Sequence, residues 1–153
     1  MEQTLVILKP DAVQRRLIGR IIQRFEDKGL RIAAMKFMRI PTDLAERHYA
    51  VHKGKPFYPS LIEYITSGPV LVMVLAGPKA IDVTRKMMGA TFGYDAAPGT
   101  IRGDFGISRT LNLVHGSDGA DSAGKEISLF FRADEIVEFS MCDEPWAIQT
   151  QNV

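Results

Sequence analysis

Short apolar runs alternate along this chain with segments of helical periodicity, and this order leaves few folds open. The clearest run, residues 70–75, is apolar throughout and lies between turn signals, which is typical of a buried strand. Leu17, Ile21 and Phe25 recur at helical spacing, and Gly29 follows them as a stop signal. By the same criteria we expect further strands over residues 4–8, 30–40 and 111–114, and further helices over residues 43–49, 79–88 and 122–131 and around residues 61–65.

The resulting order is strand, helix, strand, helix pair, strand, helix, loop, strand, helix. Two β-α-β halves of this kind predict an α+β fold, a ferredoxin-like sandwich with helices on one face of a four-stranded antiparallel sheet. The chain length suits a single domain over residues 1–153. Residues 89–106 hold five glycines and a proline, which predicts a long functional or disordered loop. We also expect Thr42 to cap the helix that follows it and Trp146 to be packed.

The charge balance and the single cysteine narrow the classes of function. A formal net charge of +1 argues against a nucleic-acid-binding protein, which is normally strongly basic. Cys142 is the only cysteine, so it cannot form an intrachain disulfide, and a reducing compartment is expected. The first residues do not resemble a signal peptide, and no apolar run approaches the roughly 18 residues of a membrane span. These observations predict a cytoplasmic protein with no membrane partner.

Three histidines are present, and their contexts differ. His48 and His52 lie four residues apart, a spacing that could place two metal ligands on one helix face. No cysteine or further histidine accompanies them, so a metal site there is disfavoured. His115 follows an apolar run and precedes Gly116, and a side chain at a strand end beside a glycine turn can project into solvent.

His115 is the strongest candidate for a catalytic residue. Ser117 and Asp118 place hydrogen-bonding and charged groups beside it, and Glu126 lies eleven residues later on a predicted helix. A carboxylate that binds one ring nitrogen would fix the tautomer and leave the other nitrogen as a nucleophile. A histidine that merely closes a strand is the alternative reading.

Three basic residues lie beside structural breaks. Lys9 ends the first predicted strand, Arg85 lies on the helix before the glycine-rich stretch, and Arg102 lies within that stretch. If they converge they would suit a polyphosphate, because arginine can bind phosphate oxygens through two parallel hydrogen bonds. The alternative is that they are surface residues that only raise solubility.

A near match to a phosphate-binding loop competes with this interpretation. Residues 119–125 follow the pattern G-x-x-x-x-G-K, but Glu126 stands where serine or threonine would bind Mg²⁺. Asp121 would also repel the phosphate. A P-loop nucleotidase is therefore disfavoured.

The segment around His115, Asn112-Leu113-Val114-His115-Gly116-Ser117-Asp118, resembles the signature of the nucleoside diphosphate kinase family, in which the histidine is phosphorylated. Other pieces of the chain resemble the family in the expected order, from about residue 4 to residue 146. They are Lys9-Pro10-Asp11, Val13-Gln14-Arg15, Phe25-Glu26 with Lys28-Gly29, His48-Tyr49, Lys55-Pro56-Phe57, Ser67-Gly68-Pro69-Val70 and Pro98-Gly99-Thr100-Ile101-Arg102-Gly103-Asp104-Phe105.

The resemblance implies an enzyme that moves the γ-phosphate of a nucleoside triphosphate, chiefly ATP, to nucleoside diphosphates by a ping-pong mechanism, maintaining the cell's NTP and dNTP pools. His115 would carry the phosphate, oriented by Glu126 and supported by Ser117, with Tyr49 nearby. Mg²⁺ would arrive on the nucleotide without a direct protein ligand, and Asp118 would interact with it indirectly. The nucleotide would be bound by Lys9, Arg85, Thr91 and Arg102 at its phosphates, by Lys9 and Asn112 at its ribose, and by Phe57 with Leu61 at its base.

The chain departs from the family pattern at a few positions. Relatives often carry glycine in place of Arg16, Asn-Pro in place of Phe92-Gly93, and a small or apolar residue in place of Arg109. The resemblance implies a homo-oligomer, and a tail that runs past Trp146 favours a hexamer over a tetramer. A non-enzymatic relative that keeps the fold is the remaining alternative, although such a module would be expected to lose the nucleophile or a phosphate-binding cation.

Overall fold

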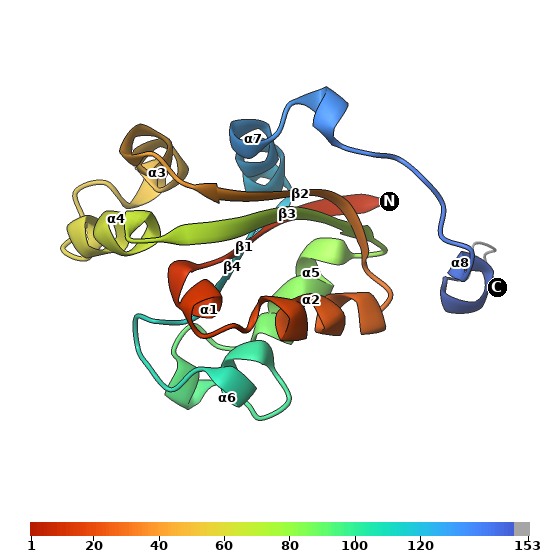
Figure 1. The fold of residues 1–153 in the computed structure, drawn as a ribbon, viewed down its shortest axis with the longest axis horizontal. Coiled ribbons are helices and arrows are strands. Elements are labelled where there is room, and N and C mark those ends of the chain that lie inside the picture. The colour runs from red at the N-terminus through yellow and green to blue at the C-terminus, as the bar shows by residue number, and fades with distance from the viewer. Residues whose placement is uncertain (149–153) are drawn as a thin grey trace.

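The computed structural model describes residues 1–148, and an antiparallel sheet of four strands forms its centre (Figure 1). The strands lie in the order β2-β3-β1-β4, and every neighbouring pair is antiparallel. This confirms the expected sheet of the ferredoxin-like α+β fold. The strand bounds are β1 (Glu2–Leu8), β2 (Arg31–Arg39), β3 (Pro69–Gly77) and β4 (Val114–Gly116).

Helices cover both faces of the sheet, so the expectation of a single covered face was wrong (Figure 1). The reason lies in the two central strands, whose continuous apolar runs are buried on both sides. Leu5 and Ile7 of β1 join one buried cluster, and Val6 and Leu8 join the other. One face is covered by α3 (Thr42–His48), α4 (Tyr58–Thr66) and α7 (Ala120–Phe130), and the other by α2 (Ile18–Asp27), α5 (Ala80–Met88) and α6 (Ile101–Phe105).

The glycine-rich stretch, residues 89–106, is an ordered segment and not the structureless loop that was expected. Thr100 caps a helix there, because its hydroxyl accepts a hydrogen bond from the backbone N–H of Gly103 at 3.0 Å. A Cβ on Gly103 would lie 1.9 Å from the carbonyl oxygen of Ala97, so close backbone approach requires glycine. The stretch contains η2 (Gly93–Asp95) and α6 (Ile101–Phe105).

The last strand begins later than expected, at Val114. The backbone of Leu113 adopts a left-handed conformation with φ of 68°, and its N–H donates to the carboxylate of Asp11 at 3.1 Å. The carbonyl of Leu113 accepts a hydrogen bond from the N–H of Lys9 at 2.8 Å, but only the three residues of β4 join the ladder with β1. Leu111 stays largely exposed.

Two smaller expectations, for Thr42 and for Trp146, also differ from the structure. Thr42 is the first residue of α3 and makes no capping hydrogen bond, because Pro41 occupies the cap position. Trp146 is 93% exposed and does not pack against the rest of residues 1–148. None of the helices over residues 1–148 is both long and apolar enough to cross a membrane. The remaining elements are α1 (Pro10–Gln14), which was not expected, η1 (Ala50–His52), η3 (Ala133–Glu135) and α8 (Glu144–Ala147).

Candidate active site

His115 lies in the middle of β4, opposite Ile7 of β1. Ser117, the residue after β4, holds the end of this strand against β1, because its backbone N–H donates to the carbonyl of Leu5 at 3.1 Å. The hydroxyl of Ser117 in turn accepts a hydrogen bond from the N–H of Leu5 at 3.2 Å. The histidine is therefore mounted on the sheet itself, and its side chain remains 21% exposed.

Glu126 of α7 contacts His115 and Ser117 together. His115 Nε2 lies 3.0 Å from Glu126 Oε1, and the Ser117 hydroxyl donates to Oε2 at 2.5 Å. Burial by itself would raise the pKa of Glu126, but the hydrogen bonds from His115 and Ser117 hold that pKa below its ordinary value. An ionised carboxylate can only accept, so Nε2 of His115 carries the ring proton and Nδ1 keeps a free lone pair.

His48 and Tyr49 pack beside the nucleophile candidate at the end of α3. The rings of His48 and His115 meet edge to face with centroids 4.6 Å apart, and the Tyr49 ring lies 6.3 Å from that of His115. Burial, with a smaller effect of nearby His115, lowers the pKa of His48 to about 3, so its imidazole is neutral at physiological pH. The His48-Tyr49 pair belongs to the family resemblance, but only Tyr49 was selected from it, and His48 was missed.

The structure brings Lys9, Asn112 and Thr91 together. Lys9 follows β1 directly and donates from Nζ to Asn112 Oδ1 at 2.7 Å, and the amide of Asn112 donates to the carbonyl of Thr91 at 3.0 Å. Burial and the nearby charge of Arg102 lower the pKa of Lys9 to about 8, against a smaller opposite effect of Asp11.

Arg102 is almost fully buried, and its guanidinium is bonded mainly to backbone carbonyls. Nε donates to the carbonyl of Asn112 at 3.1 Å, Nη1 to that of Gly89 at 3.1 Å, and Nη2 to that of Val114 at 2.6 Å. Burial and the charge of Arg85 lower its pKa to about 10. Arg102 therefore ties the glycine-rich stretch to the strand that carries His115.

Arg85 and Asp118 lie on either side of the turn after β4. Arg85 donates to the carbonyl of Gly116 at 3.4 Å, and Asp118 accepts a hydrogen bond from the Ser122 hydroxyl at 2.5 Å. The pKa of Asp118 is lowered by that hydrogen bond first and also by the charges of Arg85 and His115. Lys9 lies near Arg102 and Arg102 near Arg85, so the three cations lie close together, and Arg85 contacts the strand that carries His115.

Phe57 and Leu61 lie at the start of α4, beyond η1. Phe57 is 49% exposed, and the ring of His52 meets it edge to face with centroids 5.4 Å apart. Lys55 Nζ lies 5.7 Å from the centre of the Phe57 ring. Leu61 is partly buried and packs against the core one turn into the same helix.

The near match to a phosphate-binding loop does not form a loop. Gly119 is the cap of α7, and Gly124 and Lys125 lie within that helix. The backbone N–H groups of its interior are bonded within the helix and cannot surround a phosphate. The structure therefore leaves no site for a P-loop nucleotidase at these residues.

Comparison with known proteins identifies the family. A family model described as nucleoside diphosphate kinase matches residues 2–136, most of the chain. The chain belongs to the nucleoside diphosphate kinase family.

Relatives from archaea resemble this family member over almost their full length. A nucleoside diphosphate kinase of Thermoplasma acidophilum is 57% identical over 143 residues, which cover 94% of this chain and 97% of the relative. One from Archaeoglobus fulgidus is 56% identical over 95% of this chain and 97% of its own length. The structure of a halophilic nucleoside diphosphate kinase from Halobacterium salinarum in complex with CDP superposes with a TM-score of 0.95 at 50% identity, covering 97% of this chain and 99% of the other.

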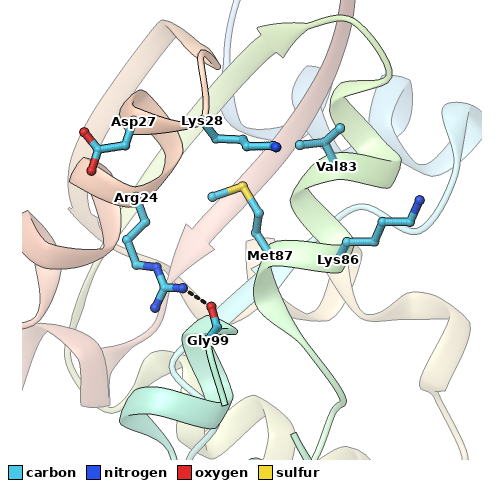
Figure 2. Close-up of a pocket in the computed structure, with 7 residues that line it drawn as sticks. All are labelled: Arg24, Asp27, Lys28, Val83, Lys86, Met87 and Gly99. Carbon is cyan, nitrogen blue, oxygen red and sulfur yellow. Dashed lines mark hydrogen bonds between the residues drawn. The ribbon is translucent and has the colours of Figure 1, made fainter. Parts of the chain in front are cut away.

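In this member of the nucleoside diphosphate kinase family, a hollow whose lining does not include His115 lies between α2 and α5 (Figure 2). Arg24 reaches across it and donates to the carbonyl of Gly99, and it also pairs with Asp104 at 2.6 Å. None of the predicted site residues lines the hollow. Arg24 thus clamps the start of α6 to α2, which holds the helix that carries Arg102. The lining residues are Arg24, Asp27, Lys28, Val83, Lys86, Met87 and Gly99.

The lowered pKa of Lys9 predicts a pH dependence. Lys9 is charged below pH 8 and loses its charge as the pH rises through about 8, so its attraction for nucleotide phosphates should disappear there. We expect kcat/KM, which reports the free enzyme, to fall as the pH rises above about 8. In Lys9→Arg the fall should move to a higher pH, because a guanidinium keeps its charge over this range. Identical pH profiles for the wild type and a folded Lys9→Arg variant would show that another group titrates.

Proposed function

We propose that His115 carries phosphate between nucleotides in two steps. The Nδ1 lone pair attacks the γ-phosphorus of a nucleoside triphosphate, chiefly ATP, and the bond from this phosphorus to the bridging oxygen breaks, which releases a nucleoside diphosphate. A terminal oxygen of a second nucleoside diphosphate then attacks the same phosphorus, and the N–P bond breaks with its electron pair returning to Nδ1. Family membership supports the overall exchange between nucleoside di- and triphosphates, which would maintain NTP and dNTP pools.

The observation that carries the His115 step is its hydrogen bond to Glu126. Because Nε2 holds the proton, phosphorylation of Nδ1 would leave the imidazole ring positively charged. The ionised carboxylate of Glu126, fixed by the Ser117 hydroxyl, would stabilise that charge and would stabilise it most after the new bond begins to form. A group that binds the charged ring better than the neutral ring lowers the barrier to phosphorylation of His115.

The converging cations would hold the transferred phosphate. Lys9 and Arg85 place positive charge near His115, and Arg102 adds a third charge through its remaining N–H donor capacity. Phosphoryl transfer needs mostly positioning and neutralised oxygens, so such a set suits the reaction. Asn112 and Thr91, bonded to one another beside Lys9, would bind the ribose and phosphate ends of the nucleotide.

We propose Mg²⁺ as the cofactor, bound mainly to the phosphates of the nucleotide. Magnesium sites of this kind use one or two protein carboxylates and several waters. Asp118 fits this limited role, since its lowered pKa keeps it ionised and one of its oxygens is already engaged by Ser122. When bound, the ion neutralises phosphate oxygens, and Asp118 would interact with its water shell.

The base would stack on Phe57. A half-exposed aromatic ring beside the site offers a face to any base, and stacking of this kind is tolerant of sequence. The Halobacterium salinarum relative was solved with CDP, so a pyrimidine nucleotide is bound within the family. Purine and pyrimidine diphosphates should therefore both be accepted here.

A homo-oligomer, with a hexamer favoured over a tetramer, completes the proposal. β2 is an edge strand, and it exposes the apolar side chains of Met35 and Phe37. The C-terminal segment also leaves apolar side chains uncovered, among them Phe139 and Trp146. A second copy of the chain would cover both. Sedimentation equilibrium tests the proposed oligomer. A monomeric mass at the protein concentration of the assays would contradict it.

The covalent step is tested by intact-protein mass spectrometry after brief exposure to ATP and Mg²⁺. We expect the protein to gain the mass of one phosphoryl group, to lose it in acid, and to transfer it to added GDP, CDP or UDP. A folded protein that binds ADP but never gains this mass would contradict the phosphohistidine step.

A further inference from the structure

Three side chains with metal-binding atoms meet behind the nucleophile candidate. One nitrogen each from His48 and His115 and one oxygen of Glu126 all lie within 4.8 Å of one another. His115 Nε2 is 3.0 Å from Glu126 Oε1, and His48 Nδ1 is 3.9 Å from the same oxygen. They come from α3, β4 and α7, which are packed elements, so their arrangement is fixed by the fold.

His48 has bonding capacity that the described chain does not use. Its side chain is only 1% exposed, and neither ring nitrogen has a hydrogen-bond partner within residues 1–148. The rings of Tyr49 and Phe130 pack against it edge to face, so apolar contacts cover much of its surface. A buried imidazole without any partner is costly and calls for an unseen bonding group, such as a water or an ion.

We infer that His48, His115 and Glu126 form a binding site for a transition-metal ion of the Zn²⁺ type. Two imidazoles and one carboxylate are a ligand set that Zn²⁺ uses when its fourth position stays open. Around a tetrahedral ion the ligand atoms lie about 3.3 Å apart, given metal–ligand distances of about 2.0–2.2 Å. The observed separations of 3.0 and 3.9 Å bracket this value, so small side-chain shifts suffice.

The chemistry of the ligands selects the ion. Mg²⁺ prefers oxygen ligands in octahedral geometry, so the Mg²⁺ that accompanies nucleotides would not occupy a site with two imidazoles. Zn²⁺, Co²⁺ and Cu²⁺ accept imidazole readily. The positive charge of nearby Lys9 repels any cation, so the site would bind its ion reversibly and not as a permanent structural centre.

Such an ion would oppose the phosphoryl transfer proposed above, and this part of the inference rests on that proposed function. A metal bound to Nε2 of His115 requires the lone pair of that nitrogen. In a neutral ring the proton must then sit on Nδ1, which removes the lone pair that attacks phosphorus. Glu126 would at the same time become a metal ligand. The site would therefore act as an inhibitory switch controlled by free transition-metal ions.

Binding is tested first without any nucleotide, by titrating the folded protein with Co²⁺ and recording its visible absorption. We expect a saturable d–d spectrum of a four-coordinate ion, removed by Zn²⁺ and unaffected by excess Mg²⁺. His48→Leu and Glu126→Gln should each weaken Co²⁺ binding by about 10-fold or more, whereas His52→Ala, which changes a partly exposed histidine outside the cluster, should not. Circular dichroism confirms that each variant is folded. The absence of a saturable spectrum in the wild type, or equal binding by the wild type and both folded ligand variants, would overturn the site.

Inhibition is tested separately, by the rate at which the protein gains phosphate from ATP and Mg²⁺ with and without Zn²⁺. Zn²⁺ at saturating concentration should slow phosphorylation by about 10-fold or more, a zinc-selective chelator should restore it, and His48→Leu should need a correspondingly higher Zn²⁺ concentration. If Co²⁺ binds but Zn²⁺ leaves phosphorylation unchanged, the inhibitory role is wrong. If the metal-free protein is never phosphorylated, the proposed function fails while the Co²⁺ result still decides the site.

Discussion

His115→Ala is expected to lower phosphoryl transfer between nucleotides by about 10⁴-fold or more and to abolish the acid-labile phosphate on the protein. The variant removes the nitrogen that would form the covalent bond, and no other described side chain stands in its place between Glu126 and the converging cations. The loss should appear in kcat and kcat/KM alike, because an interaction made only during transfer disappears. Stopped-flow assays with ATP and a deoxynucleoside diphosphate measure it.

The control for His115→Ala is ADP binding by calorimetry. Lys9, Arg102 and Phe57 are untouched in the variant, so the dissociation constant for ADP should change by less than about 10-fold. Urea denaturation checks that the variant is folded, which we expect because His115 is partly exposed. Residual transfer within about 10-fold of the wild-type rate would mean that another group accepts the phosphate.

The second large effect is expected at Arg102, for stability as well as activity. Arg102→Lys keeps the charge but cannot reproduce a planar group that bonds the carbonyls of Asn112, Gly89 and Val114 simultaneously. At least two of these buried carbonyls would lose a partner, and we expect the free energy of unfolding to fall by about 2–4 kcal/mol. The glycine-rich stretch would also loosen, so kcat should drop beyond the effect of one phosphate contact. Urea denaturation and steady-state kinetics measure the two effects.

Arg109→Lys provides the matched control in the same region. Arg109 is exposed, and its described contact is a cation–π interaction with the ring of Phe92 at 5.1 Å. An exposed interaction of this kind contributes little, so the unfolding free energy should change by less than about 1 kcal/mol. If Arg102→Lys were as stable as Arg109→Lys, the backbone hydrogen bonds of Arg102 would not hold the stretch in solution.

Much of the sheet could be predicted because its two central strands are continuous runs of mostly apolar residues. The uninterrupted apolar run at residues 70–75 had to be buried, and the run at residues 4–8 had to lie beside it. Runs of this kind need cover on both sides, yet a single covered face was expected from the general pattern of the fold. The error came from fold analogy, since the burial of both Leu5 and Val6 was already implied by the residues themselves.

In the candidate site, contacts between residues that are close in sequence could be predicted. Contacts with backbone groups from distant segments could not. The link from His115 to Glu126 followed from a strand end, a turn and one helix, and the structure shows that contact. The partners of Arg102 could not be foreseen, because they are carbonyls from three separate segments that only the folded chain brings together. The contact between His48 and His115 could not be foreseen for a similar reason: the two residues lie far apart in sequence, and the spacing of His48 suggested only nearby His52 as a partner.

The reciprocal pairing of Leu5 and Ser117 has a consequence for how the protein fails on heating. A three-residue edge strand would normally fray well before global unfolding. Here the hydroxyl and N–H of Ser117 both bond the backbone of a fully buried residue in the central strand β1. β4 can therefore open only if these hydrogen bonds to the buried central strand are broken. The amides around His115 should exchange with solvent almost as slowly as those of β1, and the catalytic apparatus should survive intact until the whole domain melts.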